Sequence, residues 1–254
     1  MNIRAFITPI ILSIAIFGYA QNVSVPKYKY RYEMVRLDST YDVKIDPKLA
    51  KYVDKKRHQM EKQMMVVVAH TNEELESYAP ESPLSNFLTD LLLNEASKYT
   101  KDTTFDNSDL SMLNFGGIRT SMPKGDVTVG DLYRISPFDN YLVFIVLKGS
   151  ELRKALGRFT DQFNAPYSGA TLVYTNNKPS QILVQGKPID DNRLYTLVTL
   201  DFISDGGDHL LENIRFEKIE YTTVTFRDFL IAELKAMTAR GEMVTGKKDG
   251  RARL

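Results

Sequence analysis

The sequence predicts a single layered α/β (α+β) domain, built from mixed sheets and packed helices, that follows a short targeting segment. Buried-strand patterns alternate along the chain with amphipathic helical patterns, which is typical of this class. The 254 residues suffice for one large domain. The balance of 43% hydrophobic and 26% charged residues is that of an ordinary globular protein. No internal repeat or interdomain linker interrupts the pattern.

The composition excludes several kinds of chemistry. The chain has no cysteine, which rules out disulfides, thiolate zinc sites, iron–sulfur clusters and cysteine nucleophiles. Its three histidines, His58, His70 and His209, are scattered and leave little material for a histidine-rich metal site. We expect no metal and no cofactor in this chain. Because 33 basic residues nearly balance 32 acidic ones, the net charge of +1 argues against binding of a nucleic-acid polymer.

The first twenty residues have the pattern of a signal peptide. Arg4 precedes an apolar run over residues 5–17, and small residues at positions 18 and 20 form a cleavage pattern before Gln21. A membrane span needs roughly twenty apolar residues, and this run is shorter. We therefore expect residues 1–20 to be removed, and the protein to be periplasmic or extracellular without a stable membrane span. An uncleaved N-terminal anchor is the alternative.

Helix starts are marked by capping residues. Residues 21–45 are polar and rich in tyrosine, so an extended segment is expected before a domain over residues 46–239. Asp46 before Pro47, and Ser82 before Pro83, each place a capping side chain ahead of the proline that favours the first helical position. The second helix has apolar residues with helical spacing. They are Leu84, Phe87, Leu88, Leu91 and Leu92.

Strands and the remaining helices follow in order. Continuous apolar or β-branched runs predict buried strands. These runs are Val66–Val68, Leu110–Leu113, Tyr141–Leu147 and Leu194–Leu200. Residues 172–174 and 182–184 flank an Asn-Asn turn and predict a hairpin. Ser150 is expected to cap a helix, and a last helix carries apolar residues from Phe226 to Met237. The basic segment 240–254 is expected to fray.

Three loops after or before predicted strands combine glycines, aromatic rings and polar groups. They are Asn114–Arg119, Ser136–Asn140 and Asp201–Asp208. Ligands of open α/β sheets gather at strand ends, and aromatic rings with polar partners suit a flat heteroaromatic ligand that carries hydroxyls and an anion. An ordinary tight turn with surface residues is the alternative interpretation of each loop alone.

These motifs resemble the C-terminal domain of the 5′-nucleotidase family, which includes UDP-sugar hydrolases and 2′,3′-cyclic phosphodiesterases. The resemblance is carried by four ordered segments and covers essentially the whole predicted domain. The segments are Glu81–Asp90, Leu113–Arg119, Pro137–Asn140 and Leu200–Asp208. The resemblance implies that Phe138 and Phe202 sandwich a nucleobase, and that Asp208 holds ribose hydroxyls.

The resemblance also implies three polar substrate contacts. Asn114 and Arg119, on either side of the glycine pair, face the base, ribose or phosphate, and Asn140 contacts the base. Arg119 suits a bidentate contact to phosphate. Two positions depart from the family pattern. Pro83 stands where some members have a second substrate arginine, and His209 stands where many have glycine, which narrows the implied pocket.

The larger departure concerns catalysis. Full-length members of this family begin with a metallophosphatase domain that holds two metals, and none of its Asp-x-His, Gly-Asp-x-x-Asp, Gly-Asn-His or Gly-His-x-His motifs occurs here. We therefore expect no catalytic residue in this chain, a nucleotide or nucleoside as ligand, and divalent metals on a separate metallophosphatase partner. The alternatives are a non-enzymatic nucleoside- or nucleotide-binding protein and a degenerate domain kept for structure.

Overall fold

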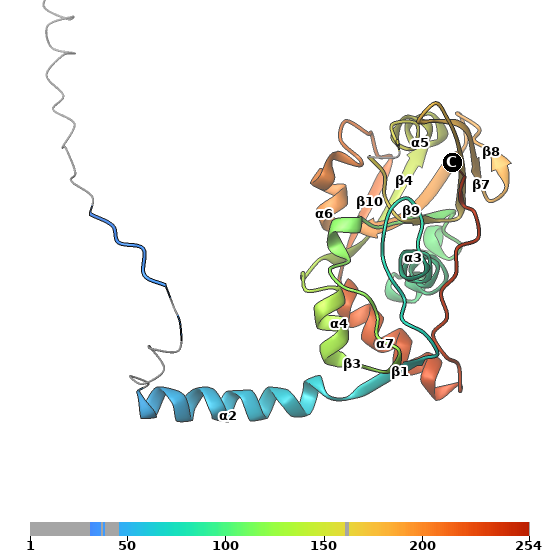
Figure 1. Ribbon diagram of the computed structural model, residues 1–254. Coiled ribbons are helices and arrows are strands. Elements are labelled where there is room, and N and C mark those ends of the chain that lie inside the picture. Colours follow the sequence, from blue (N-terminus) through green and yellow to red (C-terminus); the bar gives the residue numbers. More distant parts are fainter. Residues whose placement is uncertain (1–30, 37, 39–45, 161–162, 254) are drawn as a thin grey trace, which may run out of the picture. The chain divides into compact units, whose positions relative to one another are not determined.

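The computed structural model describes residues 31–36, 38, 46–160 and 163–253 (Figure 1). The chain divides into two units, Met1–Lys51 and Tyr52–Leu254. The predicted signal peptide lies outside the described residues. Of the predicted extended segment, residues 31–36 and 38 are described; they are exposed and belong to no helix or strand.

Helices and strands alternate along residues 47–253, as predicted. The α-helices are α2 Pro47–Met64, α3 Pro83–Glu95, α4 Val129–Ile135, α5 Gly149–Leu156, α6 Asp201–Ser204 and α7 Phe226–Ala239. The 3-10 helices are η2 Ala96–Tyr99, η3 Thr103–Phe105, η4 Phe115–Gly117 and η5 Gly207–His209. The strands are β1 Val67–Thr71, β2 Leu110–Met112, β3 Gly125–Thr128, β4 Tyr141–Lys148, β5 Tyr167–Ser168, β6 Ala170–Thr175, β7 Lys178–Val184, β8 Lys187–Pro188, β9 Leu194–Leu200, β10 Lys218–Thr225 and β11 Ala252–Arg253.

A five-stranded mixed sheet in the order β10-β4-β9-β2-β5 forms the centre of the domain. Strand β9 runs antiparallel to β4, with Leu142 opposite Leu200, and parallel to β2. A four-stranded sheet, β11-β6-β7-β8, contains the predicted hairpin, whose turn residues Asn176 and Asn177 both have the positive φ that tight hairpin turns require. Strands β1 and β3 form a separate antiparallel pair.

The central sheet is covered on both faces, which explains why β4 is a continuous apolar run. Successive side chains of a strand point to opposite faces. Accordingly Phe144 belongs to a core formed with α3, α4 and α7. Its neighbour Ile145 belongs to a second core formed with α5 and the four-stranded sheet. The predicted fold class is confirmed in this layered arrangement.

The start of α3 is as predicted, and the start of α5 is not. Ser82 and Ser85 form a reciprocal capping box at the first turn of α3, behind which Pro83 begins the helix. Helix α5 instead begins at Gly149, and the prediction that Ser150 caps it was wrong. The reason is packing: a Cβ at Gly149 would lie 1.9 Å from the backbone oxygen of Asp190, so only glycine fits at this helix start.

Residues 240–253, here called the C-terminal strap, are bound to the domain, so the expectation that they fray was wrong. The buried Glu81 carboxylate accepts hydrogen bonds from the backbone N–H groups of Asp249 at 2.7 Å and Gly250 at 3.0 Å. Strand β11 then pairs in parallel with β6. Arg251, whose side chain is 10% exposed, forms ion pairs with Asp90 and Asp249. A buried carboxylate and a buried guanidinium therefore retain a segment that looks polar and irregular in sequence.

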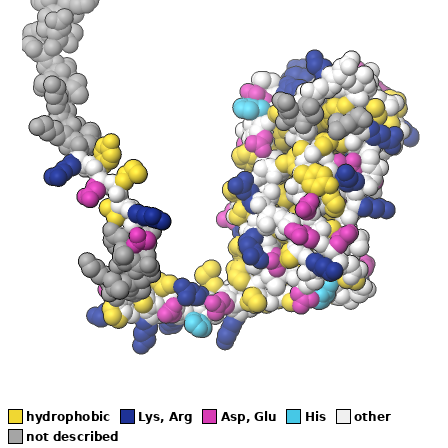
Figure 2. Space-filling model, in the orientation of Figure 1, with side chains coloured by type: hydrophobic (Ala, Val, Ile, Leu, Met, Phe, Trp, Pro, Cys, Tyr) yellow, Lys and Arg dark blue, Asp and Glu magenta, His cyan; other side chains and the backbone are white. Residues whose placement is uncertain are grey.

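Helix α2 differs from the other long helices because it buries none of its 18 residues. Asp46 begins it as predicted, and its side chain accepts a hydrogen bond from the backbone N–H of Lys48 at 2.7 Å. Lys and Arg side chains project along the helix, with hydrophobic side chains between them (Figure 2).

Candidate functional site

The three loops singled out in the sequence lie at one edge of the central sheet. Because β2 and β9 are parallel, the loops that follow them, starting at Asn114 and Asp201, leave the same edge. Strand β4 is antiparallel to β9, so the loop that precedes it, with Phe138, returns to this edge as well. The topology thereby brings together segments that are far apart in sequence.

Asn114 and Asp208 contact each other directly. The Asn114 Nδ2 atom donates a 2.7 Å hydrogen bond to Asp208 Oδ2, and Asn114 is only 6% exposed. The geometry depends on glycines: a Cβ at Gly117 would lie 2.7 Å from Asn114 Oδ1. Among the described residues, Oδ1 of Asn114 has no hydrogen-bond partner although it is buried. A buried acceptor without a donor can receive a hydrogen bond from a ligand hydroxyl or N–H group.

Phe138 and Phe202 present exposed aromatic rings at the same edge. Phe138 is 47% exposed and Phe202 is 41% exposed, whereas the phenylalanines of the cores are almost completely buried. Gly207 supports Phe202 from behind, since a Cβ at Gly207 would lie 2.5 Å from Phe202 Cε1. The ring therefore lies on bare backbone with another part of its surface toward solvent, as a stacking platform requires.

Arg119 and Asn140 lie in the same loops but make fewer contacts. Arg119 is exposed, and its Nη1 donates a 3.2 Å hydrogen bond to the Gly116 carbonyl, which keeps the guanidinium beside the glycine turn. Asn140 is half-buried, and its carbonyl accepts a 2.8 Å hydrogen bond from the Phe226 N–H. Pro83 packs toward the C-terminal strap, because a Cβ at Gly246 would lie 2.4 Å from the Pro83 oxygen.

Arg227 supports the Phe138 loop, and the sequence analysis missed it. This arginine of α7 is 8% exposed, and its guanidinium carbon lies 4.1 Å from the Tyr133 ring centroid. Its Nη1 donates to the carbonyls of Ser136 at 3.3 Å and Phe138 at 3.4 Å, and Nη2 pairs with Asp139. The sequence did contain an indication of this role: Arg227 follows Phe226 in an apolar helical stripe, and a charge buried there needs polar partners.

Tyr221 on β10 anchors the loop that contains Phe202. Its hydroxyl donates a 2.7 Å hydrogen bond to Asp205 Oδ1. This bond to a carboxylate, helped by desolvation, raises the pKa of Tyr221 above its ordinary value of 10. Deprotonation of Tyr221 removes the bond and places two negative charges side by side.

A pH dependence follows from the Tyr221–Asp205 hydrogen bond. Because the folded pKa is raised, the stability from this bond is fully present below pH 10 and is lost as the pH rises through the folded pKa. In protein labelled with ¹³Cζ-tyrosine, we expect the Tyr221 resonance to titrate above pH 10. In Asp205→Asn its pKa should fall toward the ordinary value, and an unchanged pKa in that variant would contradict the assignment. Tyr221→Phe identifies the resonance.

The histidines lie in three separate settings. His58 is on α2 with Nδ1 2.8 Å from the Asp54 carbonyl, His70 is 2.7 Å from Asp126, and His209 is 3.1 Å from Glu212. Within the described ranges, no group of three His, Asp or Glu side chains is placed to hold a metal ion. The described residues therefore do not fit a two-metal centre.

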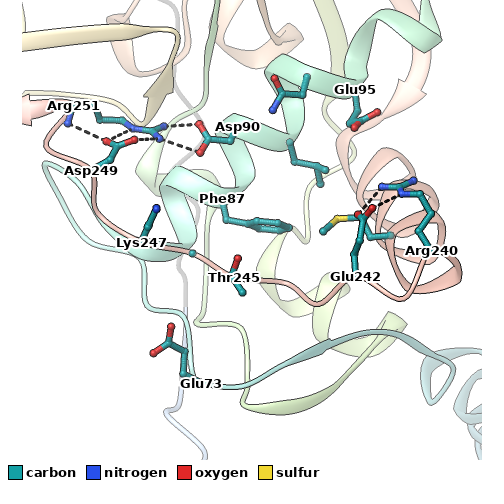
Figure 3. A pocket seen from close by; sticks show the side chains of 14 residues that line it. Glu73, Phe87, Asp90, Glu95, Arg240, Glu242, Thr245, Lys247, Asp249 and Arg251 are labelled. Carbon is teal, nitrogen blue, oxygen red and sulfur yellow. Dashed lines mark hydrogen bonds and ion pairs between the residues drawn. The ribbon is translucent and has the colours of Figure 1, made fainter.

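A cleft of about 530 Å³ lies between α3, the end of α7 and the C-terminal strap, and none of the six predicted site residues lines it (Figure 3). The Phe87 ring lies across its middle. Its guanidinium groups already have partners, since Arg251 pairs with Asp90 and Arg240 pairs with Glu242. This cleft is thus separate from the candidate site at the sheet edge.

Solved structures share this fold. A 5′-nucleotidase precursor from Thermus thermophilus is similar with a TM-score of 0.66 at 24% identity, over 80% of this chain and 42% of that one. An NAD nucleotidase from Haemophilus influenzae is similar with a TM-score of 0.60 at 19% identity, over 82% of this chain and 41% of that one. This chain thus shares its fold with less than half of each of these two proteins.

Residues 66–213, more than half of the chain, match the family described as 5′-nucleotidase, C-terminal domain. The chain therefore belongs to this family, as its four motifs predict.

Curated relatives are similar to parts of this chain. Protein UshA of Yersinia enterocolitica is 36% identical over 106 residues, which cover 40% of this chain and 19% of that protein. Endonuclease YhcR of Bacillus subtilis is 29% identical over 153 residues, which cover 58% of this chain and 12% of that protein. The 5′-nucleotidase of Vibrio cholerae is 22% identical over 186 residues, which cover 69% of this chain and 32% of that protein. The chain thus spans less than a third of the length of these relatives.

Proposed function

We propose that this domain is the nucleotide- or nucleoside-binding part of an exported 5′-nucleotidase-type phosphoester hydrolase, and that a separate metallophosphatase chain performs the hydrolysis. The observation that carries the proposal is the sheet edge itself. The loops at this edge carry two exposed phenylalanine rings, and a hydrogen-bonded Asn114–Asp208 pair in which Asn114 Oδ1 has no partner among the described residues. Export is supported by relatives such as the cell wall protein Lmo0130 of Listeria monocytogenes.

Each site residue then has a chemical task. Phe138 and Phe202 stack on the two faces of the base, which accepts any nucleobase because every base has a π-face. Asp208 accepts hydrogen bonds from ribose hydroxyls, and the free Oδ1 of Asn114 accepts another from the ligand. Arg119, exposed beside the glycine turn, contacts the phosphate with its planar guanidinium. Asn140 contacts the base edge.

The proposal of a partner chain rests on the absence of a two-metal centre among the described residues. Two-metal phosphoester hydrolysis needs ligands that hold both ions and a water molecule that the ions activate. The three histidines of this chain are separated and have other partners, and the family's metal-binding motifs do not occur in the sequence. In this proposal, this chain binds the substrate, and the partner chain binds the metals and the hydroxide that attacks the phosphate.

We expect Phe138→Ala and Phe202→Ala each to lower the affinity for adenosine and AMP by about 5- to 150-fold, because base–aromatic stacking contributes about 1–3 kcal/mol. Isothermal titration calorimetry measures this change. Tyr78→Ala is the matched control: it removes another exposed aromatic side chain, 42% exposed, from the loop after β1 and should leave the Kd unchanged. Equal Kd values for the parent and both phenylalanine variants would refute the proposed site.

Hydrolysis is tested by reconstitution. Adding this protein to a metallophosphatase chain that lacks such a domain should raise its AMP hydrolysis, and adding Phe202→Ala protein should raise it less. Binding of AMP with no gain in turnover, when both chains are folded, would favour the second candidate function. That candidate is a non-enzymatic nucleoside- or nucleotide-binding protein, and the same exposed aromatic pair supports it.

A further inference from the structure

Helix α2 is amphipathic although it buries nothing. Leu49, Val53, Met60 and Met64 recur on one side at the helical period, and Leu49 and Met60 are 60% and 56% exposed. A shallow hollow of about 440 Å³ runs along this side and is lined by residues of α2 alone. Met64, at one end of the strip, lies beside Gly130 of α4, and the rest of the strip is exposed, which is typical of an interaction surface.

The same helix concentrates positive charge. It contains six Lys or Arg residues and two acidic residues, for a net charge of +4. Since the whole chain has a net charge of +1, everything outside α2 sums to −3. Lys48, Lys51, Lys55 and Lys62 recur on the side opposite the apolar strip. Helix α2 therefore has an apolar side and an opposite side rich in lysine.

We propose that α2 binds along the surface of an anionic phospholipid bilayer, with its apolar strip in the headgroup region and its lysines facing phosphate groups. A basic amphipathic helix whose residues are polar for the most part binds in the plane of the membrane interface rather than across it. Among the residues that the structure describes, no helix has the length and apolar character that a membrane crossing requires. The apolar strip favours lipid over a nucleic acid, which would use the charge alone.

The chain offers a direct probe, because it contains no tryptophan. Tyr52 borders the apolar strip and is 60% exposed, with Lys56 Nζ 5.8 Å from its ring centroid. A Tyr52→Trp variant of the full chain places a single tryptophan on α2. Tyr78→Trp places the same reporter at an exposed tyrosine outside α2 as a control.

With vesicles of phosphatidylcholine and phosphatidylglycerol that contain brominated acyl chains, we expect the emission of Tyr52→Trp to shift to shorter wavelength and to be quenched. The emission of Tyr78→Trp should do neither. Lys51→Gln with Lys55→Gln should lower the partition coefficient of the Tyr52→Trp protein about thirtyfold, because each basic side chain near the surface contributes about a factor of five. Lys178→Gln with Lys187→Gln, on the four-stranded sheet, is the matched charge control and should leave it unchanged.

Three results would overturn the proposal. The first is an unquenched Trp at position 52 while the protein co-sediments with the vesicles. The second is equal quenching with pure phosphatidylcholine vesicles and no decrease in 1 M salt, where the Debye length falls to about 3 Å. The third is a dimer in sedimentation velocity that dissociates in Val53→Gln with Met60→Gln, because a second copy of α2 would then cover the strip.

Discussion

Glu81→Ala is expected to lower the free energy of unfolding by about 3–5 kcal/mol, because it removes a buried carboxylate that several donors share. Oε1 of Glu81 accepts hydrogen bonds from the Asn86 amide at 2.8 Å and from the backbone N–H groups of Asp249 and Gly250. Alanine leaves the N–H groups of Asp249 and Gly250 without this acceptor and opens a gap under the C-terminal strap, whereas the Asn86 amide keeps its bond to the Lys247 carbonyl. Urea denaturation followed by circular dichroism measures the loss.

The controls separate the buried network from a general effect of charge. Glu81→Gln keeps one acceptor oxygen and should cost less than Glu81→Ala. Glu76→Ala removes an exposed carboxylate nearby and should stay within about 0.5 kcal/mol of the parent. Hydrogen exchange should accelerate at the amides of Asp249 and Gly250 in Glu81→Ala. A change below about 1 kcal/mol would mean that the strap is held by other contacts.

Arg227→Met is expected to lower the free energy of unfolding by about 2–3 kcal/mol and the affinity for AMP about tenfold, although the side chain is too buried to stack on a base. The variant leaves the carbonyls of Ser136 and Phe138 without their donor, and it releases Asp139. The Phe138 ring then loses its fixed position. Urea denaturation and calorimetry give the two quantities on the same protein.

Arg227→Lys tests whether geometry or charge matters. Lysine keeps the positive charge but lacks the planar fork that reaches several acceptors at once, so both losses should be intermediate. Tyr133→Phe keeps the ring under the guanidinium and should change neither quantity. Unaltered AMP affinity in Arg227→Met, with the expected loss of stability, would show that Arg227 is structural and does not position Phe138.

Elements that repeat a local hydrophobic pattern could be predicted from the sequence. Helix α3 buries one face, which gives apolar residues at helical spacing in the sequence. Strand β4 is buried on both faces, which gives a continuous apolar run. The start of α5 and the C-terminal strap could not be predicted in this way. They depend on Gly149 fitting under Asp190 and on Glu81 reaching Asp249, and such distant polar or steric contacts leave no period.

The candidate site likewise has features that the local sequence predicts and features that depend on distant contacts. Its loops could be predicted because aromatic and glycine residues at strand ends are unusual locally, and the parallel pairing of β2 with β9 then explains why Asn114 meets Asp208. Arg227 supports the Phe138 loop because of how α7 packs against that loop. The position of one arginine in an apolar stripe does not predict which groups it contacts. The binding roles of the six residues remain predictions.

The C-terminal strap also has a consequence for the order in which contacts form during synthesis. Glu81 and its backbone donors at Asp249 and Gly250 are separated by 168 and 169 residues, so a chain that emerges N-terminus first exposes Glu81 long before its partners appear. Contacts of such long range form late in folding. A polypeptide that is still being synthesised therefore lacks these hydrogen bonds until residues 249 and 250 have emerged.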